Sequence, residues 1–137
     1  MLTDVFGGDT EELEEIEDLR ADAVRLAVRT GDLATARALA QQVATIAAGT
    51  ELPHLKADAL YCRGLLDHDA SALLAVAQRY DDASRPLQRA KALEAAAEEF
   101  TEAGQRNQAS AALVGALEAY TALGAAADVA RLRATPR

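Results

Sequence analysis

In this 137-residue chain, the residues whose spacing most suggests a binding site are three glutamates, each four residues after the one before. Residues four apart on a helix stand one turn above each other, so a helix would place Glu94, Glu98 and Glu102 in one row. Like charges at this spacing cost the helix about 0.2–0.5 kcal/mol per pair. Two interpretations stay open: one wall of a groove that binds a basic segment, or an acidic helix side that faces water.

Other charged residues can join the glutamates in such a groove. The first predicted helix has its acidic residues early and its arginines late, an order that complements the helix dipole and accounts for Arg25 and Arg29 without a function. The alternative places both arginines in the groove, opposite the glutamates. Lys91 lies one turn before Glu94 and would extend the row. The predicted partner-binding residues are therefore Arg25, Arg29, Asp58, Lys91, Glu94, Glu98 and Glu102.

The side chains typical of metal binding or nucleophilic catalysis are badly spaced for either chemistry. The chain has one cysteine, Cys62, and two histidines, His54 and His68. His54 lies two turns before Cys62 on one predicted helix and His68 follows the end of that helix, so neither reaches hydrogen-bond distance of the thiol. Asp67-His68-Asp69 lies in a turn, where adjacent side chains seldom converge on one ion. We expect no metal, no cofactor and no enzymatic activity.

The composition limits which elements and which partners are expected. Half of the residues are hydrophobic but only 4% are aromatic, and alanine and leucine, both strong helix formers, dominate. The net charge of −8 argues against contact with nucleic acid or an anionic membrane, because phosphate contacts need clustered lysine and arginine. No apolar run approaches the ~18 residues of a membrane span, and no signal peptide pattern occurs. We expect a cytoplasmic protein.

Two recurring phrases predict the elements that position the charged residues. A helix break followed by a new helix start occurs, at intervals of 37 and 36 residues, at Gly31-Asp32, His68-Asp69 and Gly104-Gln105. The second phrase is Arg20-Ala-Asp-Ala-Val24, Lys56-Ala-Asp-Ala-Leu60 and Arg89-Ala-Lys-Ala-Leu93. Periods of roughly 34–40 residues are typical of stacked helix pairs. His68 stands where the other breaks have glycine, so we expect it at positive φ.

Apolar spacing and capping residues predict the individual helices. Asp9 or Thr10 begins the first helix, and its apolar stripe is Leu13, Ile16, Leu19, Ala23, Leu26 and Ala27. Asp32 is expected to cap the second helix, and Ser84 to cap the helix that has Pro86 in its first turn. Connections of about two to five residues require neighbouring helices to be antiparallel.

The third repeat resembles the tetratricopeptide pattern. The residues that follow the family's order are Leu93, Ala96, Ala97, Phe100, Gly104, Ala109, Leu113 and Ala116. The resemblance implies an all-α, tetratricopeptide-like helical repeat solenoid whose concave groove holds peptides, with Lys91 and the three glutamates on or near that groove. We expect a linker over residues 1–8 and one repeat domain over 9–137. Its three antiparallel helix pairs cover about 9–49, 50–83 and 84–123. Residues 124–137, with a short helix from Ala126 to Ala134, are a partial cap or the first half of a fourth repeat.

A narrower resemblance extends over roughly the whole chain after Ala21. It rests mainly on residues Tyr80 to Leu93, which read Tyr-Asp-Asp-Ala-Ser-Arg-Pro-Leu-Gln-Arg-Ala-Lys-Ala-Leu. This segment resembles the tetratricopeptide-like sensor region of large actinobacterial ATP-dependent LuxR-type (MalT-like) transcriptional regulators. The phrases at Ala103-Gly104 and Ala119-Tyr120 resemble that region as well. No Gly-x-x-x-x-Gly-Lys-Ser/Thr loop occurs and no DNA-reading domain follows, so neither ATPase activity nor DNA binding is expected. We expect an excised sensor region or a free-standing relative.

Two functional hypotheses follow from these patterns. The first is a non-enzymatic signalling module that binds a protein segment or a small regulatory ligand, in the context of transcription regulation. The second is a scaffold for homo-oligomerisation, in which the terminal helices associate with another copy, because uncapped ends of helical repeats are sticky. Neither hypothesis includes direct contact with nucleic acid or a membrane.

Overall fold

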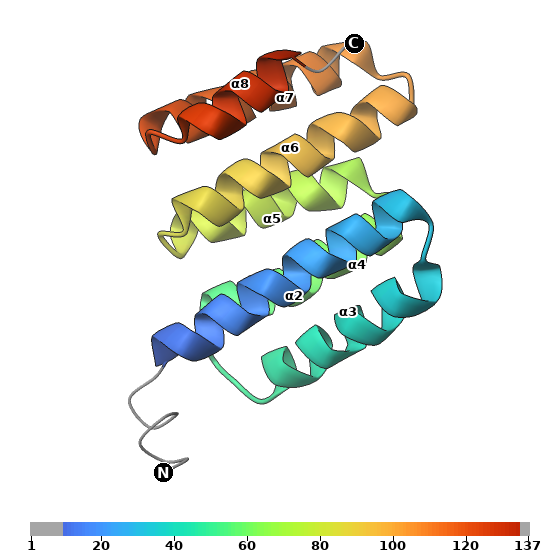
Figure 1. Cartoon of the computed structure of the whole chain (residues 1–137), viewed down its shortest axis with the longest axis vertical. Coiled ribbons are helices and arrows are strands. Elements are labelled where there is room, and N and C mark those ends of the chain that lie inside the picture. Colours follow the sequence, from blue (N-terminus) through green and yellow to red (C-terminus); the bar gives the residue numbers. More distant parts are fainter. Residues whose placement is uncertain (1–9, 135–137) are drawn as a thin grey trace. The chain divides into compact units, whose positions relative to one another are not determined.

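The computed structural model describes the backbone of residues 10–134 and the side chains of residues 19–134, and this part is entirely helical (Figure 1). Seven helices lie within it: α2 (Thr10–Thr30), α3 (Leu33–Ala48), α4 (Pro53–Leu66), α5 (Ala70–Asp82), α6 (Pro86–Glu102), α7 (Arg106–Ala122) and α8 (Ala126–Ala134). The all-α prediction is confirmed for these residues. The predicted linker over 1–8, the cap at Asp9, the side chains of Leu13 and Ile16, and residues 135–137 lie outside the part described.

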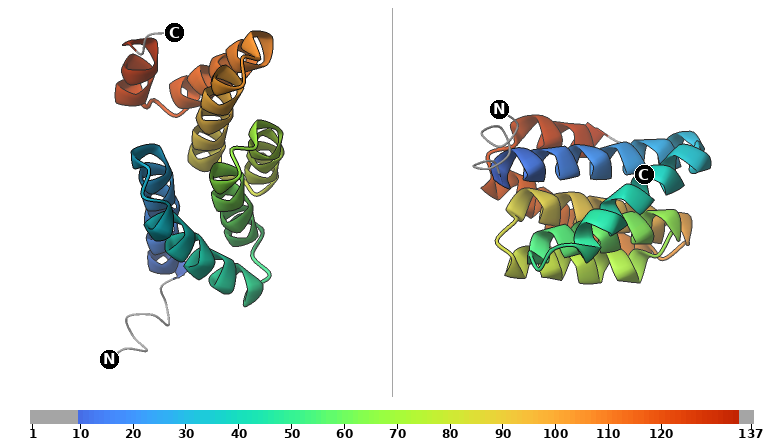
Figure 2. Two further views of the ribbon diagram at one scale, coloured as in Figure 1. Left: turned by 90° about the vertical axis from the view of Figure 1, so that its right-hand side faces the viewer. Right: turned by 90° about the horizontal axis from the view of Figure 1, so that it is seen from below.

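The helices form two compact units that divide between Asp67 and His68. In unit 1, α2, α3 and α4 each pack against the other two. In unit 2, α5 packs on α6, α6 on α7, and α7 on α8. Consecutive helices within each unit run antiparallel, as the short connections predicted (Figure 1, Figure 2). The division falls between α4 and α5, inside the predicted second repeat.

One type of turn ends four helices of the described part. The residues at positive φ in these turns are Gly31, Ser84, Gly104 and Gly124. In each turn the next amide donates a hydrogen bond to the carbonyl five residues earlier, for example from Gln105 N to Phe100 O at 2.9 Å and from Ala125 N to Tyr120 O at 3.0 Å. This bond is the mark of a Schellman motif, which satisfies carbonyls that the helix end leaves open. His68, at φ 52°, confirms the predicted left-handed turn after α4.

The helix starts confirm one predicted cap and correct another. Asp32 accepts a hydrogen bond from the amide of Thr35 at 3.2 Å and so caps α3, as predicted. Ser84 does not cap α6: it lies at φ 59° in the turn that ends α5, and Arg85 is the N-cap residue without a side-chain bond. The reason is the Schellman turn, which needs its left-handed residue two positions before Pro86. Pro86 occupies the first turn of α6, where its missing amide costs little.

The buried face of α2 differs from the predicted stripe. Leu19 and Leu26 were predicted in the core, but 67% and 63% of their surface is exposed. Among the side chains of this helix that the structure describes, those of residues 19–30, the buried ones are Ala21, Val24 and Ala27. Because α2 packs against two neighbours at once, its small residues face them and permit close approach, and the leucines lie outside.

The core of unit 2 combines alanines with a few large side chains. Helix α6 buries Ala90, Ala92, Ala95, Ala96 and Ala97. Close approach to α7 is visible at Gly115, where an added Cβ would lie 3.4 Å from Cδ1 of Leu93. Aromatic rings complete the core, with Tyr80, Phe100 and Tyr120 all buried. Helix α6 is therefore covered on most of its circumference, and this includes one of the predicted site residues.

Candidate functional site

The candidate site is a buried carboxylate, Glu94, at which three helices of unit 2 meet. Its side chain is only 3% exposed. Helix α6 supplies Glu94, α7 supplies Tyr120 and α8 supplies Arg131. The two guanidinium nitrogens of Arg131 donate to Glu94, from Nη1 to Oε2 at 2.7 Å and from Nη2 to Oε1 at 3.0 Å. The hydroxyl of Tyr120 donates to the same Oε1 at 2.9 Å.

Arg131 connects the buried carboxylate to the surface. Its Nη2 also donates to Oδ1 of Asp128 at 2.9 Å, one turn earlier on α8, and 47% of its side chain stays exposed. The hydrogen bond to Glu94 raises the pKa of Arg131 above its ordinary value. The guanidinium therefore stays charged, and it bridges a buried and a partly exposed carboxylate.

The geometry at Glu94 is suited to binding a planar cation. A buried carboxylate is unfavourable unless it is paired and hydrogen-bonded. Two parallel N–H···O bonds fit the fork of a guanidinium, whereas an ammonium group offers only a point charge. The hydroxyl of Tyr120, which donates to Oε1, helps to fix the orientation of the carboxylate. The arrangement can thus recognise arginine by shape as well as by charge.

The three predicted glutamates do not form one surface row. Glu98 and Glu102 are exposed, as a surface row requires, but Glu94 is buried under α8 and departs from that expectation. The physical reason is the bidentate partner: Arg131 compensates a charge that would otherwise have to face water. Lys91 is half-buried one turn before Glu94. The row therefore begins inside unit 2 and continues on its surface.

The other three predicted site residues belong to unit 1. Arg29 is exposed in the last turn of α2, where a cation complements the helix dipole. Arg25 is half-buried on the same helix, and Asp58 is buried on α4. The seven predicted residues are thus divided between the two units, and the four on α6 include the one at the centre of the candidate site.

The turn before α5 holds a second contact between a basic and an acidic residue. Nδ1 of His68 lies 3.0 Å and 3.2 Å from the two carboxylate oxygens of Glu99 on α6. This contact gives His68 a second role beside its turn conformation. Among the residues described, no group of three or more histidine, cysteine, aspartate or glutamate side chains could hold a metal ion.

Sequence reasoning missed the residues that complete the site, Tyr120 and Arg131. A signal for Arg131 was present, because it follows Glu94 by 37 residues, one repeat period. In stacked helix pairs, a residue one period later lies on the next equivalent helix, where it can meet its counterpart. Opposite charges one period apart are therefore candidates for an ion pair between repeats.

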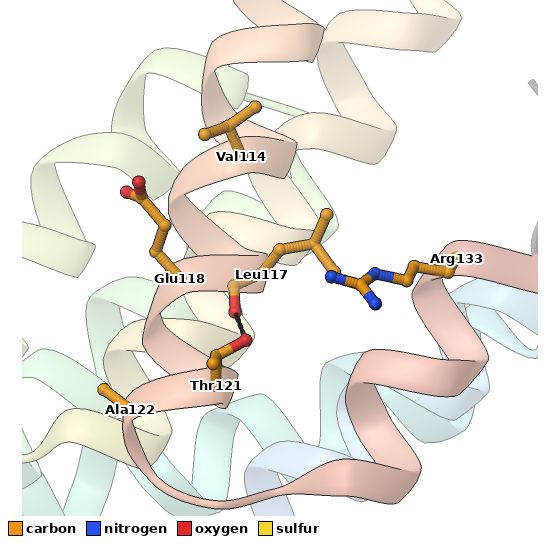
Figure 3. A pocket seen from close by; sticks show the side chains of 6 residues that line it. All are labelled: Val114, Leu117, Glu118, Thr121, Ala122 and Arg133. Carbon is orange, nitrogen blue, oxygen red and sulfur yellow. Dashed lines mark hydrogen bonds between the residues drawn. The ribbon is translucent and has the colours of Figure 1, made fainter.

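A shallow depression lies between α7 and α8 (Figure 3). Its volume is about 380 Å³, and its lining residues are Val114, Leu117, Glu118, Thr121, Ala122 and Arg133. The side chain of Arg133 extends from α8 toward Leu117 (Figure 3). The hydroxyl of Thr121 donates a hydrogen bond to the carbonyl oxygen of Leu117 at 2.7 Å. The depression marks where α8 covers α7 incompletely.

No protein-family model matches the chain, and no curated protein or solved structure matches it either. Across the described residues, no helix combines the length and the apolar character that crossing a membrane would require. Over residues 10–134, the structure consists of helices that form antiparallel hairpins within each unit. In unit 2 these hairpins build a guanidinium-binding carboxylate.

Proposed function

We propose that this protein is a cytoplasmic, non-enzymatic, tetratricopeptide-like module that binds a basic segment of a partner protein along α6. The recurring phrases, the antiparallel hairpins within each unit and the repeated Schellman turns support a helical repeat. Such repeats present extended surfaces that bind other molecules. The net charge of −8 favours a basic partner and speeds its encounter.

The observation that carries this proposal is that Glu94 already binds a guanidinium, that of Arg131. One side of α6 already binds a guanidinium, through bonds of 2.7 Å and 3.0 Å. Glu98 and Glu102 continue from it by one and two turns, and both are exposed. The Cβ atoms of glutamates on successive turns are about 5–6 Å apart. This distance is close to the ~6.6–6.8 Å between alternate residues of an extended chain. An extended segment with basic residues at alternate positions would match this spacing.

The proposed context is transcription regulation. It is supported by the resemblance of residues 80–93 to the sensor region of LuxR-type regulators. In this context, the bound segment, or a small regulatory ligand in its place, would report a signal to the regulator. A binding screen with both kinds of molecule separates these two forms of the proposal.

The test is charge reversal on the exposed part of the row. We expect Glu98→Lys/Glu102→Lys to weaken binding of a synthetic peptide with alternating arginines, by tenfold or more in fluorescence anisotropy. The matched control is Glu51→Lys/Glu118→Lys, which changes the net charge equally at exposed positions that do not belong to α6. Equal losses of affinity in both variants would show that net charge alone weakens binding, and would contradict the proposed binding surface.

A second candidate function, a scaffold for self-association, is favoured by two exposed leucines among the described side chains of α2. Leu19 and Leu26 lie seven residues apart, on one side of the helix, and both leave most of their surface in water. A second copy could cover them. Light scattering over a concentration series, with Leu19→Gln/Leu26→Gln as the comparison, tests this candidate. A constant monomer mass at high concentration would defeat it.

A further inference from the structure

We propose that Glu94 and Tyr120 form a receptor for an arginine side chain of the partner, and that Arg131 occupies this receptor as an internal competitor. The inference rests on the proposed function and specifies its ligand and its regulation. Helix α8 would then be an autoinhibitory element, which a partner must displace before its own arginine reaches the buried carboxylate.

The receptor is built independently of α8. Glu94 lies on α6 and Tyr120 on α7, and these two helices pack closely against each other. The tyrosine hydroxyl holds Oε1 at 2.9 Å, so the carboxylate is oriented by α7. Two oxygens in a fixed plane accept a guanidinium as a bidentate pair, which lysine cannot form. The ligand class is therefore an arginine side chain rather than any cation.

Helix α8 has the properties of a displaceable element. It has nine residues, whereas isolated helices shorter than ~12–15 residues are marginal in water. Within Ala126–Ala134, Leu132 is the one buried residue, and the helix packs against α7. Gly124, at φ 72°, lies in the turn that joins it to α7. Its position therefore depends largely on Leu132 and on the pair between Arg131 and Glu94.

Release of Arg131 creates a strong requirement for another guanidinium. With α8 docked, the side chain of Glu94 is 3% exposed. A second guanidinium that takes the place of Arg131 would keep this carboxylate covered and its charge paired in the same bidentate geometry. A partner that brings an arginine to Glu94 and further basic residues to Glu98 and Glu102 would satisfy the whole row. Internal competition weakens binding, because the partner's apparent affinity is its intrinsic affinity multiplied by the fraction of molecules in which α8 is undocked.

The first test asks whether the vacated site binds a free guanidinium. We expect millimolar N-ethylguanidinium to raise the melting temperature of Arg131→Ala by several degrees, and ethylammonium to have no such effect. Arg133→Ala, on the same helix, is the matched control and should not respond. The response should also vanish in Glu94→Gln/Arg131→Ala. Absence of a specific response in Arg131→Ala would overturn the receptor.

The second test measures competition by α8. We expect Arg131→Lys, which keeps the charge but loses the bidentate fork, to bind the arginine peptide at least tenfold more tightly than the unmodified chain. Addition of Glu94→Gln should remove that gain. This variant also serves if Arg131→Ala fails to fold.

The outcomes separate the inference from the proposed function. If Glu98→Lys/Glu102→Lys abolishes peptide binding while Arg131→Lys leaves the affinity unchanged, the binding surface stands and the competition by α8 is overturned. A gain that survives Glu94→Gln also overturns it, because the gain would then come from a loosened α8 alone. Loss of peptide binding by charge reversal at the control positions alone would contradict both.

Discussion

A single buried carboxylate links three helices of unit 2. Glu94 accepts hydrogen bonds from both guanidinium nitrogens of Arg131 and from the hydroxyl of Tyr120. Hydrogen bonds that involve ionised groups are roughly twice as strong as neutral ones. Both partners thus help to offset the cost of burying the charge.

Removal of one partner should therefore be costly, and removal of both much less so. We expect Arg131→Ala to lower the free energy of unfolding of unit 2 by roughly 3 kcal/mol, since it leaves a buried charge with one partner fewer. In Glu94→Gln/Arg131→Ala, the neutral amide should recover part of this loss. A double-mutant cycle in urea, with hydrogen exchange followed over α6 to α8, gives the coupling energy. Additive effects would contradict a direct pair.

Asp32 provides a pH-dependent contribution at the start of α3. Hydrogen bonds from the side chain and the backbone of Thr35 lower the pKa of Asp32 below its ordinary value of 3.8. The folded state then binds fewer protons than the unfolded state, so the stabilisation is complete above pH 3.8 and is lost as the pH falls through the folded-state pKa.

We expect Asp32→Ala to melt at a lower temperature than the unmodified chain at neutral pH, with a difference that shrinks on acidification through this range. Asp32→Asn is the control, because it keeps an acceptor oxygen but does not titrate. Thermal melts by circular dichroism from pH 2.5 to 7 make the measurement. A difference that is constant over this range would show that the charge of the cap contributes nothing.

At the scale of elements, the helix ends of unit 2 follow a period of 20 residues. Tyr80, Phe100 and Tyr120 are each buried, and the carbonyl of each accepts the Schellman bond that closes its helix. Four residues after each aromatic stands the left-handed residue, Ser84 in the first turn and glycine in the other two. One buried ring and one turn thus recur in every helix from α5 to α7.

Ser84 breaks the glycine rule in this series, and its replacement should stabilise the turn. A non-glycine residue in the left-handed region costs about 1–2 kcal/mol. Replacement by glycine recovers only part of this, because glycine gives up more conformational freedom on folding. We expect Ser84→Gly to raise the unfolding free energy by about 0.5–1 kcal/mol in urea titrations. The reciprocal control, Gly104→Ala, should lower it by about 1 kcal/mol, because its φ is 76° although the added Cβ would meet nothing within 4 Å. Changes of the same sign in both variants would refute this account of the turn.

Local signals in the sequence predicted most elements, whereas the choice of buried face depended on packing. Asp32 and His68 act through their own backbone neighbourhood, so their roles could be inferred from residue type. Leu19 and Leu26 could not be placed in this way, because the small residues on the opposite side of α2 permit closer packing. Glu94 was identified as a candidate residue, but its burial depends on Arg131, a residue 37 positions away.

At the scale of the whole molecule, the guanidinium site lies entirely within unit 2. Glu94, Tyr120 and Arg131 all follow the division between Asp67 and His68. The exposed glutamates of α6 belong to the same unit. The binding chemistry proposed for this protein should therefore need no side chain from unit 1.

A fragment of residues 68–137 should consequently fold and keep the site. Its core has large side chains from each of α5, α6 and α7, and the described helices of this unit pack consecutively on one another. We expect the fragment to be helical, to melt cooperatively, and to bind the arginine peptide with the affinity of the full chain. Circular dichroism and fluorescence anisotropy provide the measurements.

The shorter fragment 86–137 is the control, because it lacks α5 and so removes Leu73, Val76 and Tyr80 from the core. Burial of large apolar side chains contributes ~1.5–3 kcal/mol each, so this fragment should lose cooperative melting. If the fragment of residues 68–137 also melts without cooperativity, unit 2 depends on unit 1 for its stability. If it melts cooperatively but does not bind the peptide, unit 1 must contribute to the binding surface. The predicted residues of unit 1 would then be the candidates for that contribution.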